Sequence, residues 1–138
     1  MWTAVFLRVP RILLRTPCKP TESLAKVKIA VLNVFPDARF RREDDVVEAE
    51  ASSVERLREQ IRNQKIRDTA RTVLLRGRAT NTIRFGLNKQ AAYVGAVSFA
   101  AEATPLGDIE VLIETDDVDR LIDDIAESTL KKPGEALR

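Results

Sequence analysis

The chain contains no histidine and only one cysteine, one tryptophan and one tyrosine in 138 residues. The lack of histidine excludes Ser-His and Cys-His catalysis and His-ligated zinc. A lone cysteine, Cys18, excludes an intramolecular disulfide and predicts a reducing, cytoplasmic compartment. The five glycines are scattered, so the sequence offers no glycine-rich loop that would cradle a phosphate.

Long hydrophobic runs are also missing. No segment approaches the ~18 apolar residues of a membrane span, and arginines and prolines interrupt the N-terminal stretch MWTAVFLRVPRILLRTPCKP, so we expect neither a signal nor membrane association. No run matches the aromatic fingerprint of RNA-recognition motifs. The apolar fraction of 44% and the charged fraction of 32% are typical of a folded globular chain. The length predicts a single domain over residues 1–138.

Charge is the strongest feature that the sequence does have. Between Arg56 and Lys89, ten basic residues face only two acids, a net charge of +8, whereas the whole chain carries +2. Between Asp108 and Glu127, nine acids face a single arginine, a net charge of −8. A basic stretch of this density is typical of a surface that binds a polyanion.

Apolar spacing predicts the elements of the first third of the chain. A strand is expected over 3–15, and a helix capped by Thr21 is expected to run through about Val34. Its expected buried face comprises Leu24, Val27, Val31 and Leu32. Residues 38–42 and 46–51 then have the pattern of two strands joined in a hairpin.

The basic stretch is expected to be helical. Ser52, with Glu55 three residues later, indicates a capping box. The apolar phase continues through a break near residues 63–64 until Gly77, which is expected to end the helix in the left-handed conformation. The expected buried stripe comprises Val54, Leu57, Ile61, Ile66, Ala70, Val73 and Leu74.

The last third predicts three strands over 82–87, 94–99 and 109–113, with one helical turn at 88–92. A final helix should begin at Asp116 or Asp117. Its expected buried positions are Val118, Leu121, Ile122 and Ile125. Residues 127–138 are expected to form a frayed tail. Short strands in hairpins with helices between them predict an α+β fold, with helices on one face of a mainly antiparallel sheet.

The arginines of the basic stretch lie off the predicted buried stripe, so they should face solvent or a partner. The planar, permanently charged guanidinium suits phosphate, which favours a nucleic-acid surface. The alternative is a solvated face, or a surface that pairs with the chain's own acids. The segment NKQAAYVG offers polar side chains for RNA and Tyr93 for stacking on a base. Composition alone favours a polar strand-to-helix turn there.

The acids of the final helix invite comparison with a Mg²⁺ site. Acids in a first helical turn are favoured by the helix dipole, and the others fit the wet face of an amphipathic helix. We therefore expect no metal, no cofactor and no catalytic residue.

Several sequence blocks resemble the archaeal group known as uncharacterised protein family 0201. The blocks are LREQIRNQKIRDTARTVLLRG, FGLNKQAAYVGAVSF, KPTES and NVFPDA, and the likeness covers about Lys19 to Ala126. The resemblance implies an RNA-binding protein with a fold similar to the ribosomal protein that holds 5S RNA. It also implies a homodimer and association with the exosome or a ribosome-related complex. The matched polar positions are Gln64, Arg67, Asp68, Thr69, Arg71, Asn88, Lys89 and Gln90.

The sequence thus predicts a non-catalytic RNA-binding protein, an accessory of RNA processing or degradation. The candidate contacts with RNA are Arg58, Arg62, Lys65, Arg67, Arg71, Arg76, Arg78, Arg84, Asn88, Lys89 and Gln90. The alternative is an assembly module, in which the basic face of one subunit docks on the acidic region of another.

Overall fold

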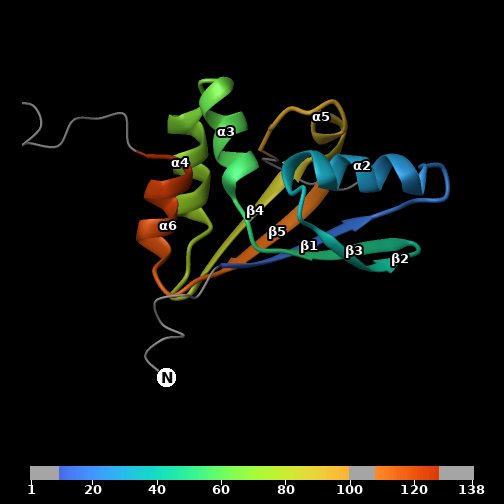
Figure 1. Ribbon diagram of the computed structural model, residues 1–138, viewed down its shortest axis with the longest axis horizontal. Helices are drawn as coiled ribbons and strands as arrows, with labels where there is room; N and C mark the ends of the chain where they lie inside the picture. Colours follow the sequence, from blue (N-terminus) through green and yellow to red (C-terminus); the bar gives the residue numbers. More distant parts are fainter. Residues whose placement is uncertain (1–9, 100–107, 128–138) are drawn as a thin grey trace, which may run out of the picture.

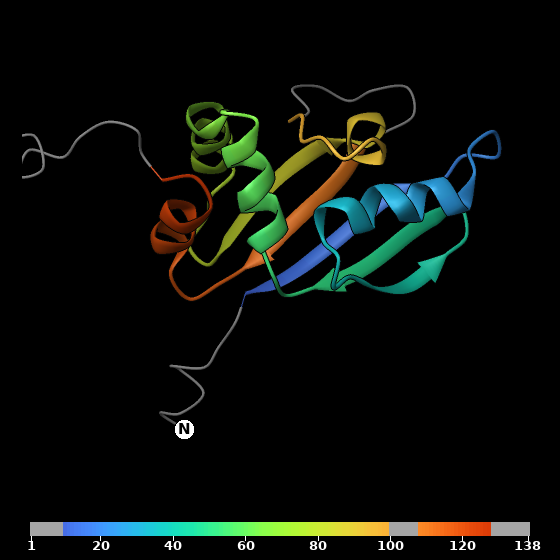
Figure 2. The same ribbon diagram turned by 45° about the horizontal axis from the view of Figure 1, so that its top comes forward.

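The computed structural model describes residues 10–99 and 108–127, which form a five-stranded antiparallel sheet with helices on one face (Figures 1 and 2). The order across the sheet is β2-β3-β1-β5-β4. The strands are β1 (Arg11–Pro17), β2 (Arg39–Glu43), β3 (Val46–Ala51), β4 (Thr82–Asn88) and β5 (Asp108–Glu114). The predicted α+β class and the predicted hairpin are confirmed.

The described residues contain five helices. They are α2 (Leu24–Val34), α3 (Glu55–Asn63), α4 (Arg67–Arg76), α5 (Lys89–Tyr93) and α6 (Val118–Ile125). In both ribbon views, α2 and α5 cover one end of the sheet, while α3, α4 and α6 cover the other. The helical layer therefore has two ends, one formed by α2 and α5 and the other by α3, α4 and α6.

Strand alternation decides which face of the sheet the helices cover. On β1, Ile12 and Leu14 are buried beneath the helices, whereas Arg11 and Arg15 are exposed on the opposite face. Its neighbour β5 and the edge strand β4 alternate in the same way, since Ile109, Val111, Ile113, Ile83, Phe85 and Leu87 are all buried. Antiparallel sheets can leave one face to solvent in this manner.

The start of α2 differs from the prediction by a few residues. Ser23, not Thr21, is the N-cap, and its hydroxyl accepts a hydrogen bond from the amide three residues later at 3.4 Å. Leu32 is 36% exposed, so its predicted place in the core is wrong. Ala30 and Val34 are buried instead, so the face of α2 that packs on the sheet comprises Val27, Ala30, Val31 and Val34.

The predicted capping box at the start of α3 is wrong. Ser52 lies before the helix and donates from its amide and hydroxyl to the Asp37 carboxylate, at 2.9 and 3.1 Å. Val54 occupies the N-cap position without a side-chain hydrogen bond. The break between the two helices is confirmed, since α3 and α4 are separate and Lys65 between them has a φ of 59°.

Gly77 ends α4, but not in the predicted left-handed conformation, because its φ is −92°. Glycine is required here for close approach: a Cβ would lie 1.7 Å from the carbonyl oxygen of Arg84 on β4. The Arg84 amide donates to the Gly77 carbonyl at 2.9 Å. The chain therefore turns from α4 into β4 with the two backbones in direct contact.

The predicted strand over 94–99 is wrong within the described residues. Val94 and Gly95 form a turn, and only Phe99 pairs with Leu87 of β4. The amide of Asn88 also donates to the Ser98 carbonyl at 2.7 Å. Residues 3–9 of the first predicted strand and the tail beyond Glu127 lie outside the described residues.

The final helix is confirmed near its predicted start. Asp117 caps α6 by accepting a hydrogen bond from the amide three residues later at 3.1 Å. Val118, Ile122 and Ile125 are buried, but Leu121 is only partly buried, so the predicted stripe is confirmed at three of its four positions.

Candidate nucleic-acid interface

Four arginines of the basic stretch form ion pairs with acids of α6 and of the segment that follows it. The N–O distances are 2.8 Å for Arg58–Asp124, 2.6 Å for Arg71–Asp123, 2.6 Å for Arg78–Asp119 and 3.5 Å for Arg67–Glu127. The partners lie 41 to 66 residues apart in sequence. The basic and acidic segments therefore neutralise part of each other's charge within one chain.

The fold holds the acidic helix against these arginines. Ile122 and Ile125 of α6 are at most 2% exposed and belong to the same core as the buried residues of α3 and α4. Arg71 also donates to the carbonyl of Ala126 at 3.2 Å. Apolar burial thus anchors α6 beside α3 and α4, with its acids next to these arginines.

Among the described residues, three other cations of α3, α4 and the turn between them are exposed and have no ion pair: Arg62, Lys65 and Arg76. Arg62 lies in the last turn of α3, Lys65 lies between α3 and α4, and Arg76 is the last residue of α4. An anion could approach these side chains without displacing an acid of the same chain.

The polar segment at the end of β4 has a structural role at two of its three predicted positions. The Asn88 side chain caps α5 by accepting a hydrogen bond from an α5 amide at 2.8 Å. The Lys89 side chain is 6% exposed, and its Nζ donates to the Pro17 carbonyl at 2.6 Å and to Glu22 at 3.0 Å. Gln90 is exposed and lines a groove.

Two glutamines connect α3 to the segment after α5. Gln60 donates to the carbonyls of Asn33 and Gly95, at 3.3 and 3.0 Å. Gln64 both donates to and accepts from the backbone of Val97, each at 2.8 Å. The sequence does not predict this role for either residue, although Gln60 falls in the helical phase of the buried stripe. These glutamines hold the loop after α5 against α3.

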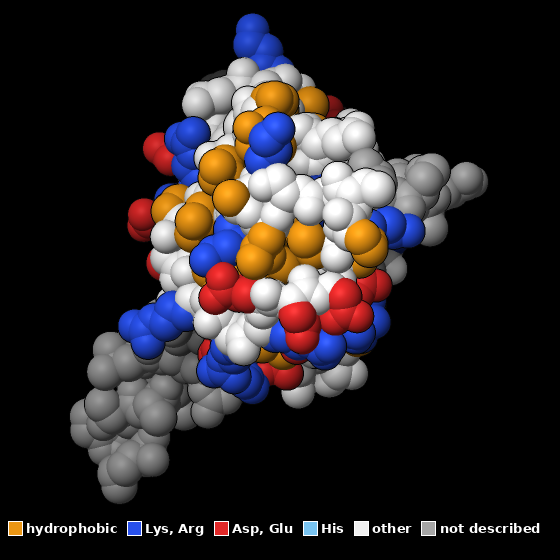
Figure 3. All heavy atoms as spheres, turned by 90° about the vertical axis from the view of Figure 1, so that its right-hand side faces the viewer, with side chains coloured by type: hydrophobic (Ala, Val, Ile, Leu, Met, Phe, Trp, Pro, Cys, Tyr) orange, Lys and Arg blue, Asp and Glu red, His pale blue; other side chains and the backbone are white. Residues whose placement is uncertain are grey.

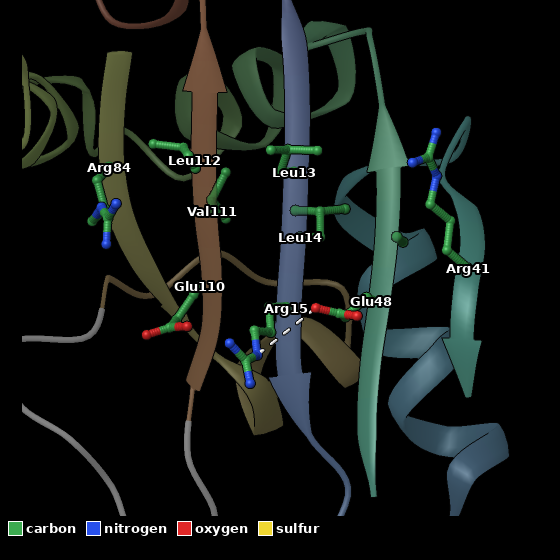
Figure 4. A pocket seen from close by; sticks show the side chains of 10 residues that line it. Leu13, Leu14, Arg15, Arg41, Glu48, Arg84, Glu110, Val111 and Leu112 are labelled. Atoms are coloured by element: carbon green, nitrogen blue, oxygen red, sulfur yellow. Dashed lines mark ion pairs between the residues drawn. The ribbon is translucent and has the colours of Figure 1, made fainter. Parts of the chain in front are cut away.

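The uncovered face of the sheet has its own hollow of about 400 Å³ (Figure 4). Leu13 and Leu112 are paired across β1 and β5 and line it, as do Arg15 and Glu48, which form an ion pair at 4.0 Å. Arg84 is exposed there and has no ion pair within the described part of the chain. Because acids and arginines alternate on this face, it carries no concentrated positive charge.

A groove of about 480 Å³ lies between α2 and α5. Buried Val27 and Ala30 form part of its apolar floor, and Lys26 lies above it with its Nζ 5.8 Å from the centroid of the Tyr93 ring. Tyr93 is 39% exposed and Val94 is 75% exposed. The space-filling view of this end of the molecule shows hydrophobic side chains gathered among lysines and arginines (Figure 3).

In residues 10–99 and 108–127, no helix combines the length and apolar character that a membrane crossing requires. In the same ranges, no three cysteine, aspartate or glutamate side chains gather as a metal site would need.

Known proteins resemble this chain in sequence and in fold. A family model described as RNA binding matches residues 11–115. The UPF0201 protein of Methanocaldococcus jannaschii is 42% identical over 124 residues, which cover 86% of this chain and 73% of that relative. The crystal structure of an uncharacterized UPF0201 protein matches with a TM-score of 0.81 and 38% identity, over 89% of this chain and 98% of the other. A second, from Methanococcus jannaschii, has a TM-score of 0.78 and 42% identity, over 84% and 98%. By sequence and by fold, this chain belongs to the UPF0201 family of archaeal proteins.

Proposed function

We propose that this protein binds RNA without altering it chemically, through contacts of its unpaired cations with the phosphate backbone. The family model described as RNA binding carries this proposal, because it matches residues 11–115 and so includes the whole sheet and helices α2 to α5. The charge of the α3–α4 turn supports it, since Arg62 and Lys65 are exposed without an acidic partner among the described residues.

The proposed interface is narrower than the basic stretch read from the sequence. Arg58, Arg67, Arg71 and Arg78 already have acidic partners, and an arginine in an ion pair gains less from a phosphate than a free one. We therefore assign the first contacts with phosphate to Arg62, Lys65 and Arg76. The four paired arginines are assigned a weaker attraction for the phosphate backbone. Lys89 has no proposed contact, because it is buried.

The assembly alternative requires the acids of a second subunit to meet the basic face. In this structure the acids of the same chain already pair with four of these arginines, so a second subunit's acids would have to displace them. A homodimer, association with an exosome, and an accessory role in RNA processing stay predictions.

The non-catalytic part of the proposal rests on the side chains available. The chain has no histidine for proton transfer, and Asp119, Asp123 and Asp124 of α6 each pair with an arginine. We expect labelled RNA to stay intact during incubation with the protein and Mg²⁺ or Mn²⁺. Cleavage that disappears in a Glu114→Gln/Asp119→Asn variant would overturn this part.

Fluorescence anisotropy with a labelled single-stranded RNA tests the binding itself. About four phosphate contacts would give a slope near −3 for log affinity against log salt, or roughly a 50-fold loss between about 50 and 200 mM salt. An Arg62→Gln/Lys65→Gln variant should lower that slope by about 1.4, because two contacts of about 0.7 each are removed.

An Arg39→Gln/Arg120→Gln variant is the matched control, since it removes the same charge from two exposed arginines on β2 and α6. Its slope should stay close to that of the unaltered protein. An equal loss in both variants would sink the proposed surface but keep RNA binding. The absence of salt-dependent binding to either single-stranded or duplex RNA would sink the function.

A further inference from the structure

The groove between α2 and α5 combines three chemical groups that a nucleotide uses. Tyr93 provides an exposed aromatic ring, Lys26 a cation and Gln90 an amide with both a donor and an acceptor, all from residues that line the same hollow. The volume of about 480 Å³ falls within the range typical of small-ligand sites.

The charges around the groove favour an anion. Glu22 also lines it, but the Lys89 ammonium lies 3.0 Å from that carboxylate, and the two side chains are 12% and 6% exposed. This pair is internally neutral, so it does not repel a phosphate strongly. Lys26 is exposed and no carboxylate among the described residues pairs with it, so the lip of the groove carries a net positive charge.

The aromatic ring is available for stacking. Tyr93 is 39% exposed, and its only ring contact among the described residues is with the Lys26 ammonium, 5.8 Å from the centroid. Stacking on a tyrosine tolerates any base, because every base has a π-face. Bases of a duplex are stacked on each other and cannot reach a single ring in this way.

We infer that this groove holds one unpaired nucleotide of a single-stranded RNA, with its base on Tyr93 and its phosphate on Lys26. Gln90 borders the same space and can bond the edge of the base. This inference deepens the proposed function and rests on it. The exposed Val94 extends the apolar rim against which the ribose and base can pack.

Tyr93 is the only tyrosine of the chain, so 3-fluorotyrosine incorporation puts a single ¹⁹F reporter in the groove. The probes are a ten-nucleotide oligouridylate and a blunt RNA duplex of ten base pairs. We expect the ¹⁹F resonance to move on addition of the single strand and to stay in place with the duplex.

The outcomes separate the two proposals. Single-strand binding by anisotropy with an unchanged ¹⁹F resonance would overturn the nucleotide site and leave RNA binding intact. A resonance that moves with protein concentration in the absence of RNA would overturn it in favour of a second copy in the groove. If neither the single strand nor the duplex binds, the proposed function itself is wrong.

Variants provide the second test. Tyr93→Leu keeps an apolar side chain but removes the ring, and should weaken single-strand binding by about 5- to 100-fold. Tyr93→Phe keeps the ring and should change affinity by less than about twofold. Equal affinities of the Leu and Phe variants, both folded by circular dichroism, would contradict stacking.

Lys26→Gln keeps the inference testable if the Leu variant does not fold, because Lys26 is exposed on α2. It should reduce the salt slope for the single strand by about 0.7, the contribution of one phosphate contact. Arg39→Gln removes one positive charge from another surface and should leave the slope unchanged. Equal slopes for these two variants would contradict the phosphate contact.

Discussion

The two ends of the helical layer hold their ionic groups in opposite ways. Beneath α2 and α5, one lysine is buried with one glutamate, Lys89 with Glu22, and neither is more than 12% exposed. At the α3–α4–α6 end, four ion pairs lie at the surface, and each contains an acid that is at least 49% exposed. The densest charge in the sequence is thus at the end where solvent screens it most.

The difference separates charge that stabilises the fold from charge that is available to a ligand. A buried pair is sensitive to the loss of either partner, because the other charge is left without solvent. An exposed pair contributes little to stability, since water and salt screen it. Free cations remain at both ends: Lys26 beside the groove, and Arg62 and Lys65 at the α3–α4 turn.

The largest expected effect is at the buried pair. Lys89→Met should lower the free energy of unfolding by about 3–5 kcal/mol, because it leaves the Glu22 carboxylate buried without its cation. Urea denaturation followed by circular dichroism measures this loss. Adding Glu22→Gln should recover much of it, since no buried charge then remains. A loss below about 1 kcal/mol in Lys89→Met would show that the α2–α5 end tolerates an unpaired carboxylate as readily as the exposed α3–α4–α6 end does.

The next effect concerns the apolar anchor of the acidic helix. Ile122 is 1% exposed, so Ile122→Ala should cost about 2–5 kcal/mol of unfolding free energy through lost burial and a cavity. Leu121 is only partly buried, so Leu121→Ala should cost less. Urea melts of both variants give the comparison. A larger loss for Leu121→Ala would mean that α6 is rotated relative to this packing.

A smaller effect is expected for the exposed pairs. Asp123→Asn removes the partner of Arg71 and should cost about 0–1 kcal/mol, since Asp123 is 54% exposed. The cost should shrink in high salt. Glu110→Gln is the control, because Glu110 is exposed and has no ion pair in residues 10–99 and 108–127. If Asp123→Asn costs as much as Ile122→Ala, the Arg71–Asp123 ion pair stabilises the fold despite its exposure to solvent.

Most of the fold followed from local pattern, and its errors have identifiable physical causes. The alternation Ile83, Phe85, Leu87 identified β4, because one face of that strand is buried throughout. The segment 94–99 has a similar apolar content but forms a loop, since Gln60 of α3 and Gln64 at its C-cap, both far away in sequence, bond its backbone. The sequence predicts a left-handed backbone at Gly77, but its φ is −92°. Glycine is needed there because a Cβ would overlap the carbonyl oxygen of Arg84.

The candidate site was harder to predict, because ion pairing across 41 to 66 residues is invisible to local spacing. The sequence gives the charge of Arg58 and Arg71 but not the distance to Asp124 and Asp123. Composition predicts only a polar strand-to-helix turn around Tyr93, whereas the structure shows its ring 39% exposed beside Lys26 at the end of the short helix α5.

The smallest expected effect tests whether the paired arginines are held back from RNA. Asp119→Asn removes the acid 2.6 Å from Arg78, whose side chain is 48% exposed. One freed cation should raise affinity for single-stranded RNA by about fivefold or less near 50 mM salt and steepen the salt slope by about 0.7. Anisotropy with the same labelled RNA measures both quantities. Glu110→Gln changes the net charge equally but frees no arginine of the described chain, so it should have the smaller effect. Equal gains in the two variants would mean that net charge governs affinity; no gain in either would place Arg78 outside the path of the RNA and confine the interface to the cations that are already free.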